Sequence, residues 1–98
     1  MDDLLKVLRD IQKCPHLYLG EPSLERLYSY IGGFSCAEEI FGRQSTCLDG
    51  FQEYIQGIYN IHSDQNWANI IQFFCVTQAE AFDMFYKHLD DFIRQNNY

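Results

Sequence analysis

Apolar residues recur along this chain at steps of three and four positions, the spacing that places them on one face of an α-helix. The strict alternation of apolar and polar residues that marks a half-buried strand does not occur in the sequence. Asp2 and Asp3 open the first such stretch, where their charges suit the positive end of a helix dipole. Pro15 closes it, because the residue before a proline disfavours the α conformation. The apolar positions of this first predicted helix are Leu4, Leu5, Val7, Leu8 and Ile11.

A second helix is predicted to begin after Ser23, whose hydroxyl can cap its first amides. Gly32 and Gly33 weaken this helix near its end by up to about 1 kcal/mol each. The pattern nevertheless allows the helix to continue as far as Gly42. Its apolar face consists of Leu24, Leu27, Tyr28, Ile31 and Phe34.

The chain between these two helices is predicted to be a loop that starts at Pro15 and ends with the segment YLGEPS, residues 18–23. Gly20 tolerates a positive φ angle, and Pro22 has a fixed φ angle. These residues are typical of a turn, so we expect a structural role rather than a binding loop. Tyr18 and Leu19 are predicted to fold back onto the helices.

The third predicted helix has the most regular apolar face in the chain, and Asp49 is predicted to cap it. Its apolar positions are Phe51, Tyr54, Ile55, Ile58 and Tyr59. A shorter fourth helix, with Ser63 or Asp64 as its cap, is expected to lie in the core because it is apolar on most sides. Its apolar positions are Trp67, Ile70, Ile71, Phe73 and Phe74. The run IIQFFCV, residues 70–76, could instead form a buried strand, but no second strand is available to pair with it, so we favour a helix.

The last predicted helix begins at a capping box, in which Thr77 and Glu80 satisfy amides at the helix start reciprocally. Its inward positions are Ala81, Phe82, Phe85, Leu89, Phe92 and Ile93. Two ion pairs with i,i+4 spacing are predicted on its outer face: Asp83 with Lys87, and Asp90 with Arg94.

These elements predict an all-α fold, a compact single-domain bundle of about five helices over residues 1–98. A chain of 98 residues has room for one core only. Hydrophobic residues make up 47 % of the chain and aromatic residues 16 %, which excludes an intrinsically disordered protein.

The balance of charge limits the classes of partner. Fourteen acidic and seven basic residues give a formal net charge of −7, which repels phosphate backbones and anionic lipid headgroups. We therefore expect no direct binding of nucleic acid or of a membrane, and no apolar run is long enough to span a bilayer. A basic protein partner fits this charge, although an acidic cytosolic protein without such a partner would have the same composition.

The acidic residues in the middle of the chain are almost unopposed, since Arg43 is the only basic residue between Arg26 and Lys87. Such a surface can steer association with a cationic cleft, which raises the association rate by roughly 10- to 1,000-fold at low salt. The simpler interpretation is that these carboxylates are only solvated. The candidate partner-binding residues are Glu38, Glu39, Asp49, Glu53 and Asp64.

Motifs for catalysis, metal binding and cofactor binding are absent from the sequence. His16, His62 and His88 have no neighbouring nucleophile in a recognisable motif. The sequence contains neither a zinc-binding H-E-x-x-H motif nor an alternating-aspartate calcium loop, and its one glycine pair lacks a phosphate-binding context. We therefore expect no enzymatic activity, no cofactor and no metal site.

The four cysteines, Cys14, Cys36, Cys47 and Cys75, lack the spacing of a metal site or of a disulfide framework. The first residues, MDDLLKVLRD, have no apolar core of the kind found in signal peptides. We therefore expect a cytoplasmic protein with four reduced thiols, most of them small residues of the core or its boundary.

Four features occur in an order that resembles small helical bacterial immunity proteins: CPHLYLGEPSLERLYSYIGGF, GFQEYIQGIYNI, the isolated Trp67, and QAEAFDMFYKHLDDF. The most similar group belongs to contact-dependent growth-inhibition and related polymorphic toxin systems, and the resemblance covers roughly residues 11–93. It implies a cytosolic inhibitor with no activity of its own. Such a protein binds the C-terminal domain of one cognate toxin, frequently a nuclease, and occludes its basic active-site cleft. It would be a monomer, or a 1:1 heterodimer with the toxin.

A second hypothesis comes from a different class of function. The chain could be a small structural or regulatory helical module that has no toxin partner and self-associates through exposed Tyr and Phe residues. The first hypothesis predicts salt-sensitive binding of one basic domain, whereas the second predicts self-association that depends on concentration.

Overall fold

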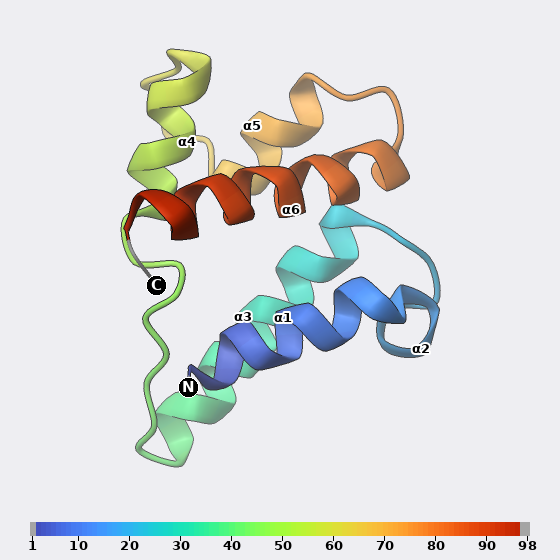
Figure 1. Ribbon diagram of the computed structural model, residues 1–98, viewed down its shortest axis with the longest axis vertical. Helices are drawn as coiled ribbons and strands as arrows, with labels where there is room; N and C mark the ends of the chain where they lie inside the picture. The colour runs from blue at the N-terminus through green and yellow to red at the C-terminus, as the bar shows by residue number, and fades with distance from the viewer. Residues whose placement is uncertain (1, 97–98) are drawn as a thin grey trace.

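Six α-helices account for the regular secondary structure of residues 2–96, the part of the chain that the computed structural model describes (Figure 1). The prediction of an all-α fold is confirmed, since these residues contain no strand. The alternative of a buried strand at residues 70–76 is excluded, because residues 70–73 lie in α5 and residues 74–76 form no strand. In chain order the helices are α1 (Asp3–Lys13), α2 (Pro15–Leu19), α3 (Leu24–Ile40), α4 (Phe51–Tyr59), α5 (Trp67–Phe73) and α6 (Gln78–Gln95).

Helix α6 separates the other helices into two groups. Figure 1 shows α4 and α5 on one side of α6, and α1, α2 and α3 on the other. Helix α3 packs against both α6 and α5, so the two groups share one core. The Cα radius of gyration is 13.1 Å, which matches the value of about 13 Å for a compact chain of 100 residues.

The short helix α2 lies where the sequence predicts only a loop. Pro15 ends α1 as expected, but its fixed φ angle also suits the first position of a new helix. The resulting single turn buries Leu19, and the half-exposed ring of Tyr18 packs edge to face on Tyr30 of α3 at a centroid distance of 6.2 Å, so both residues fold back onto the helices as predicted. The turn itself is confirmed: Gly20 has a φ angle of +82°, and the Ser23 hydroxyl caps α3 by accepting a hydrogen bond from the Arg26 amide at 3.2 Å.

Two of the predicted helix caps are wrong. Asp49 does not cap α4, because Gly50, with a φ angle of +83°, occupies the cap position and offers no side chain. Neither Ser63 nor Asp64 caps α5, whose cap is Asn66. The side chain of Gln52 accounts for the later start of α5, since it donates to the Gln65 carbonyl at 2.9 Å and accepts from the Trp67 amide at 2.8 Å.

The predicted capping box of α6 is half formed. The Thr77 hydroxyl accepts a hydrogen bond from the Glu80 amide at 3.0 Å, as expected. The Glu80 carboxylate, however, accepts from the amide of Val76 at 3.3 Å rather than from that of Thr77. Glu80 is thereby held against the turn between α5 and α6.

The predicted ion pairs of α6 are also wrong. Asp90 pairs with Arg9 of α1 at 2.7 Å instead of with Arg94, and Arg94 pairs with Asp91 at 3.1 Å. Asp83 and Lys87 form no ion pair within residues 2–96. The spacing along one helix identified possible partners, but the approach of α1 supplied a nearer cation for Asp90.

Phe51 lies at the centre of the core, where α4, α5 and α6 meet. Its buried ring packs edge to face against Trp67, Phe85 and Phe92, with centroid distances of 5.1, 5.6 and 5.4 Å. Aromatic pairs of this kind contribute about 0.5 to 1.5 kcal/mol each beyond the burial of area. Most of the predicted apolar faces are buried around this cluster, and four of their residues are exposed instead: Tyr28, Ile58, Phe73 and Phe74.

The first residues of the chain hold the 43–50 loop in place. One carboxylate oxygen of Asp2 accepts from the Leu5 amide at 3.0 Å, and the other accepts from the amides of Thr46 and Cys47 at 2.6 and 3.0 Å. Burial by itself raises the pKa of Asp2, but these three amides outweigh it and hold the pKa below its ordinary value. We call Asp2 with its three amide partners the N-terminal clasp.

Replacing Tyr86 with Phe tests the contact between α6 and α1. The buried Tyr86 hydroxyl donates to the Leu8 carbonyl at 2.6 Å, so Y86F removes one hydrogen bond without opening a cavity. We expect the free energy of unfolding to fall by about 1 to 2 kcal/mol in chemical denaturation. The control is Y28F, because the Tyr28 hydroxyl has no hydrogen-bond partner among residues 2–96. Equal stability of Y86F and wild type would contradict the assignment.

Replacing Asp2 with Asn tests the charge in the N-terminal clasp. Because the pKa of Asp2 in the folded state lies below 3.8, the carboxylate stabilises the fold above about pH 4. This contribution is lost as the pH falls through the lowered pKa. We expect D2N to be less stable than wild type near neutral pH and the difference to narrow towards about pH 3.

Chemical denaturation at several pH values measures this difference, with D83N as the control. Asp83 is exposed and forms no ion pair within residues 2–96, so D83N should follow the wild-type curve. A difference between D2N and wild type that stays constant with pH would show that the charge of Asp2 does not stabilise the clasp.

Candidate functional site

The structure does not gather the predicted partner-binding carboxylates into one patch. Glu38 and Glu39 lie near the C-terminal end of α3, whereas Glu53 lies in the first turn of α4. Asp49 precedes α4, and Asp64 lies in the loop between α4 and α5. Figure 1 shows the end of α3 and helix α4 at opposite ends of the long axis of the molecule. The residues therefore form two groups, one at the end of α3 and one around α4.

The group at the end of α3 is partly used inside the molecule. The Ser45 hydroxyl donates to the Glu38 carboxylate at 2.6 Å and accepts from the Leu4 amide at 3.0 Å, which continues the N-terminal clasp. Arg43 lines the same shallow hollow as Glu38 and Glu39, and it also pairs with Asp3, its Nε donating to that carboxylate at 2.8 Å. Positive and negative charges are therefore mixed at this end.

The group around α4 belongs to a larger segment without cations. Residues 44–86 contain no Lys or Arg and include α4, α5 and the first half of α6; we call this segment the acidic side. The ion pairs of residues 2–96 use only carboxylates outside it, namely Asp3, Asp10, Glu21, Asp90 and Asp91. The carboxylates of the acidic side are without an ion-pair partner in that same part of the chain: Asp49, Glu53, Asp64, Glu80 and Asp83. Their negative charge is therefore directed to solvent.

An exposed apolar surface lies on this acidic side. Phe73 is 80 % exposed, Phe74 is 51 % exposed and Val76 is 91 % exposed, all at the end of α5 or in the turn that follows it. Phe73 also borders a hollow of about 220 Å³ together with Ile61. We call Ile61, Phe73, Phe74 and Val76 the aromatic corner.

Phe73 and Phe74 lie at the surface, so the prediction that they belong to the core is wrong. Trp67, Ile70 and Ile71 are buried on the inner face of α5. Phe73 lies six positions after Trp67, which is off the i, i+3, i+4, i+7 series of that face. This spacing is the feature of the sequence that could have identified Phe73 as an exposed residue.

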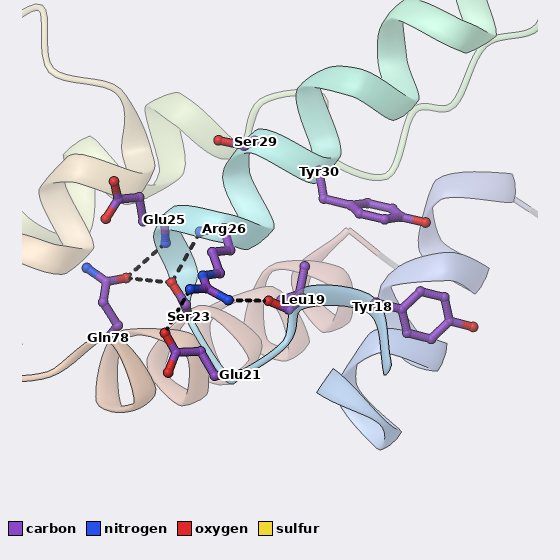
Figure 2. A pocket seen from close by; sticks show the side chains of 9 residues that line it. All are labelled: Tyr18, Leu19, Glu21, Ser23, Glu25, Arg26, Ser29, Tyr30 and Gln78. Carbon is purple, nitrogen blue, oxygen red and sulfur yellow. Dashed lines mark hydrogen bonds and ion pairs between the residues drawn. The ribbon is translucent and has the colours of Figure 1, made fainter. Parts of the chain in front are cut away.

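A hollow of about 700 Å³ lies beside the turn at Gly20. Figure 2 shows Arg26 at its centre, where the guanidinium donates to the Leu19 carbonyl at 2.7 Å and pairs with Glu21 at 3.3 Å. The side-chain oxygen of Gln78 accepts from the Ser23 hydroxyl and the Glu25 amide at 3.3 and 2.9 Å. These polar groups satisfy one another, so the hollow holds a turn in place and presents no convergent set of free donors. This arrangement agrees with the expected structural role of YLGEPS.

The histidines do not assemble a catalytic centre. His88 is buried on α6, where burial lowers its pKa, and its Nε2 forms a hydrogen bond with the Tyr59 hydroxyl at 2.7 Å, the direction of which depends on the ring tautomer. Burial also raises the pKa of Tyr59, which keeps its proton. His16 and His62 are exposed on α2 and in the α4–α5 loop. Among residues 2–96, no three His, Cys, Asp or Glu side chains are grouped closely enough to hold a metal ion.

Comparison with models of protein families, with curated proteins and with solved structures finds no match for the chain. No helix within residues 2–96 has the length and apolar character needed to cross a bilayer. The assignment of function therefore depends on the charges and the exposed surfaces described above.

The four cysteines differ enough in environment to be distinguished by their rates of alkylation. Cys47 is buried, and burial together with the nearby Asp2 carboxylate raises its pKa to about 12, which suppresses the reactive thiolate. Cys14 and Cys36 are exposed, while Cys75 is half-buried and its pKa is raised by burial. We expect iodoacetamide near pH 8 to label Cys14 and Cys36 first, Cys75 more slowly, and Cys47 only on unfolding, at least about 100-fold more slowly than the exposed thiols.

Peptide mass spectrometry of the labelled protein measures these rates, and labelling in denaturant provides the control in which all four thiols react. Comparable rates for Cys47 and Cys14 in the folded protein would contradict the burial of Cys47 beneath the N-terminal clasp.

Proposed function

We propose that this protein is an immunity-type inhibitor that binds one cognate toxin domain with a basic surface and occludes its active-site cleft. The observation that supports the proposal best is the acidic side, where five carboxylates face no Lys or Arg partner within residues 2–96. A nuclease cleft is basic because its substrate is a polyanion, so a nuclease, for example a ribonuclease, is the toxin activity that fits this charge. The proposed complex is a 1:1 heterodimer in the cytoplasm.

The resemblance of the sequence to immunity proteins implies a basic toxin domain as the partner, and the acidic net charge favours the same class of partner. In this proposal the chain has no enzymatic activity and no cofactor, and inhibition results from occupying the cleft. Asp49, Glu53 and Asp64 are the principal charges that face the toxin. Glu38 and Glu39 contribute less, because Arg43 and Ser45 lie beside them.

The second candidate function is a structural or regulatory helical module that binds a further copy of itself. The exposed aromatic corner favours this candidate, since it is an apolar surface that a second copy could cover. Asp64 and Glu80 lie beside that surface, however, and two copies would bring these like charges together. Sedimentation at high protein concentration separates the two candidates, because the inhibitor should remain a monomer without its toxin.

Co-expression tests the proposed function directly. A candidate toxin domain, sought as the product of the gene immediately upstream of this one, is expressed in bacteria with and without the chain, and growth and co-purification are recorded. Restored growth together with a 1:1 complex is the expected result. Continued toxicity with no complex would contradict the immunity function and leave the structural or regulatory helical module as the remaining candidate.

Neutralising the carboxylates around α4 tests the role of charge. We expect D49N/E53Q/D64N to slow association with the toxic domain by about 10-fold or more at low salt, and the effect to shrink at high salt. The control is D10N/D90N/D91N, which changes the net charge equally but alters carboxylates that are already ion-paired. Surface plasmon resonance at two salt concentrations measures both rates. Equal rates for the two triple variants would show that these carboxylates do not face the partner.

A further inference from the structure

The rings of the aromatic corner are held in fixed positions although they are exposed. Phe74 stacks on Tyr59 of α4 with a centroid distance of 4.8 Å, and Phe73 packs edge to face on Phe74 at 5.2 Å. Tyr59 is in turn fixed by its hydrogen bond to His88 of α6. An apolar surface whose side chains are already ordered loses little conformational entropy when a partner covers it.

The hollow beside Phe73 has the size and lining of a site for one side chain. Its volume of about 220 Å³ is smaller than the roughly 300 to 1,000 Å³ of small-molecule sites. Ile61, Ile70 and Phe73 form its apolar part, and Ser63 and Gln65 form a polar edge. A single apolar side chain that projects from a partner would fill it.

The charges near the aromatic corner decide which partner fits. Asp64 lies in the chain between Ser63 and Gln65, which border the hollow, and Glu80 accepts a hydrogen bond from the amide of Val76, a residue of the corner outside the hollow. The acidic side contains no Lys or Arg that would offset them. An anionic membrane or a second copy of the chain would therefore be repelled, whereas a basic protein surface would be attracted.

We propose that the aromatic corner is the anchor of the interface with the basic toxin domain. In the complex, an apolar side chain of the toxin domain fills the hollow bordered by Ile61 and Phe73, and basic residues around it face Asp64 and Glu80. This arrangement has an apolar centre and a charged rim, which is how most protein interfaces divide their affinity and specificity. The inference rests on the proposed function and names the surface that performs it.

The end of α3 has a second exposed aromatic residue, Phe41, which provides the matched control. Phe41 is 77 % exposed, nearly the same fraction as Phe73, and like Phe73 it lies at the C-terminal end of a helix. Arg43 lies beside it together with Asp3 and Glu38, so charges of both signs are mixed there, unlike on the acidic side. Figure 1 shows the end of α3 far from α5, so the two positions report on different surfaces.

The test compares F73Q with F41Q by calorimetric titration against the purified candidate toxin domain. We expect F73Q to weaken binding by about 10- to 100-fold and F41Q by less than about 3-fold. The loss in F73Q should be equally large at low and high salt, because an apolar contact is removed. Circular dichroism and thermal melting should show both variants to be folded, since each replaced ring is largely exposed.

The possible outcomes distinguish a wrong docking surface from a wrong function. If wild type binds the toxic domain and F73Q binds it as tightly, the toxin docks elsewhere and the inference is overturned, while the immunity function stands. If F41Q is the weakened variant, the end of α3 is the interface and the inference is likewise overturned. If wild type does not bind, the proposed function fails and the inference fails with it.

Discussion

The burial of Phe51 among Trp67, Phe85 and Phe92 is the interaction on which the positions of α4, α5 and α6 depend. Phe51 is the first residue of α4, so its contacts fix the point at which that helix leaves the core. Because the aromatic rings meet edge to face, their mutual orientation is defined as well as their distance. The loop between α4 and α5 and the exposed end of α5 are consequently presented on a rigid support.

Helix α6 divides the molecule chemically as well as spatially. On one side of it, the cations of α1 and of the loop after α3 meet carboxylates, as in the contacts of Arg9 with Asp90 and of Arg43 with Asp3. On the other side, residues 44–73 contain no Lys or Arg, and the carboxylates there are exposed, namely Asp49, Glu53 and Asp64. Exposed surface ion pairs contribute little to stability, so this division has little consequence for folding. In the proposed function its consequence is for binding, because a field of one sign favours a partner of the other sign.

Local features of the sequence predict most of this fold, and they fail where distant residues decide the outcome. Thr77 caps its helix as expected, because capping depends on neighbours three positions away. The start of α2 at Pro15 could also have been anticipated, because the proline ring that ends α1 has a φ angle suited to the first position of a helix. The cap of α5 is also local, since the Asn66 side chain accepts from the Asn69 amide at 2.8 Å, but its position after Ser63 and Asp64 is supported by the side chain of Gln52 from another helix, which the sequence does not reveal. Composition predicts an acidic surface, and the spacing of Phe73 from Trp67 is off the buried face of α5, which agrees with the exposed position of Phe73.

Hydrogen–deuterium exchange of this chain with and without the proposed toxin domain tests the proposed binding surface most directly, because it reports every segment at once. We expect slower exchange on binding in residues 61–76, which contain the aromatic corner, and unchanged exchange in residues 36–44 at the end of α3. Protection confined to residues 36–44, or a complete absence of protection at equimolar concentration, would contradict the claim that the acidic side of this protein is its binding surface.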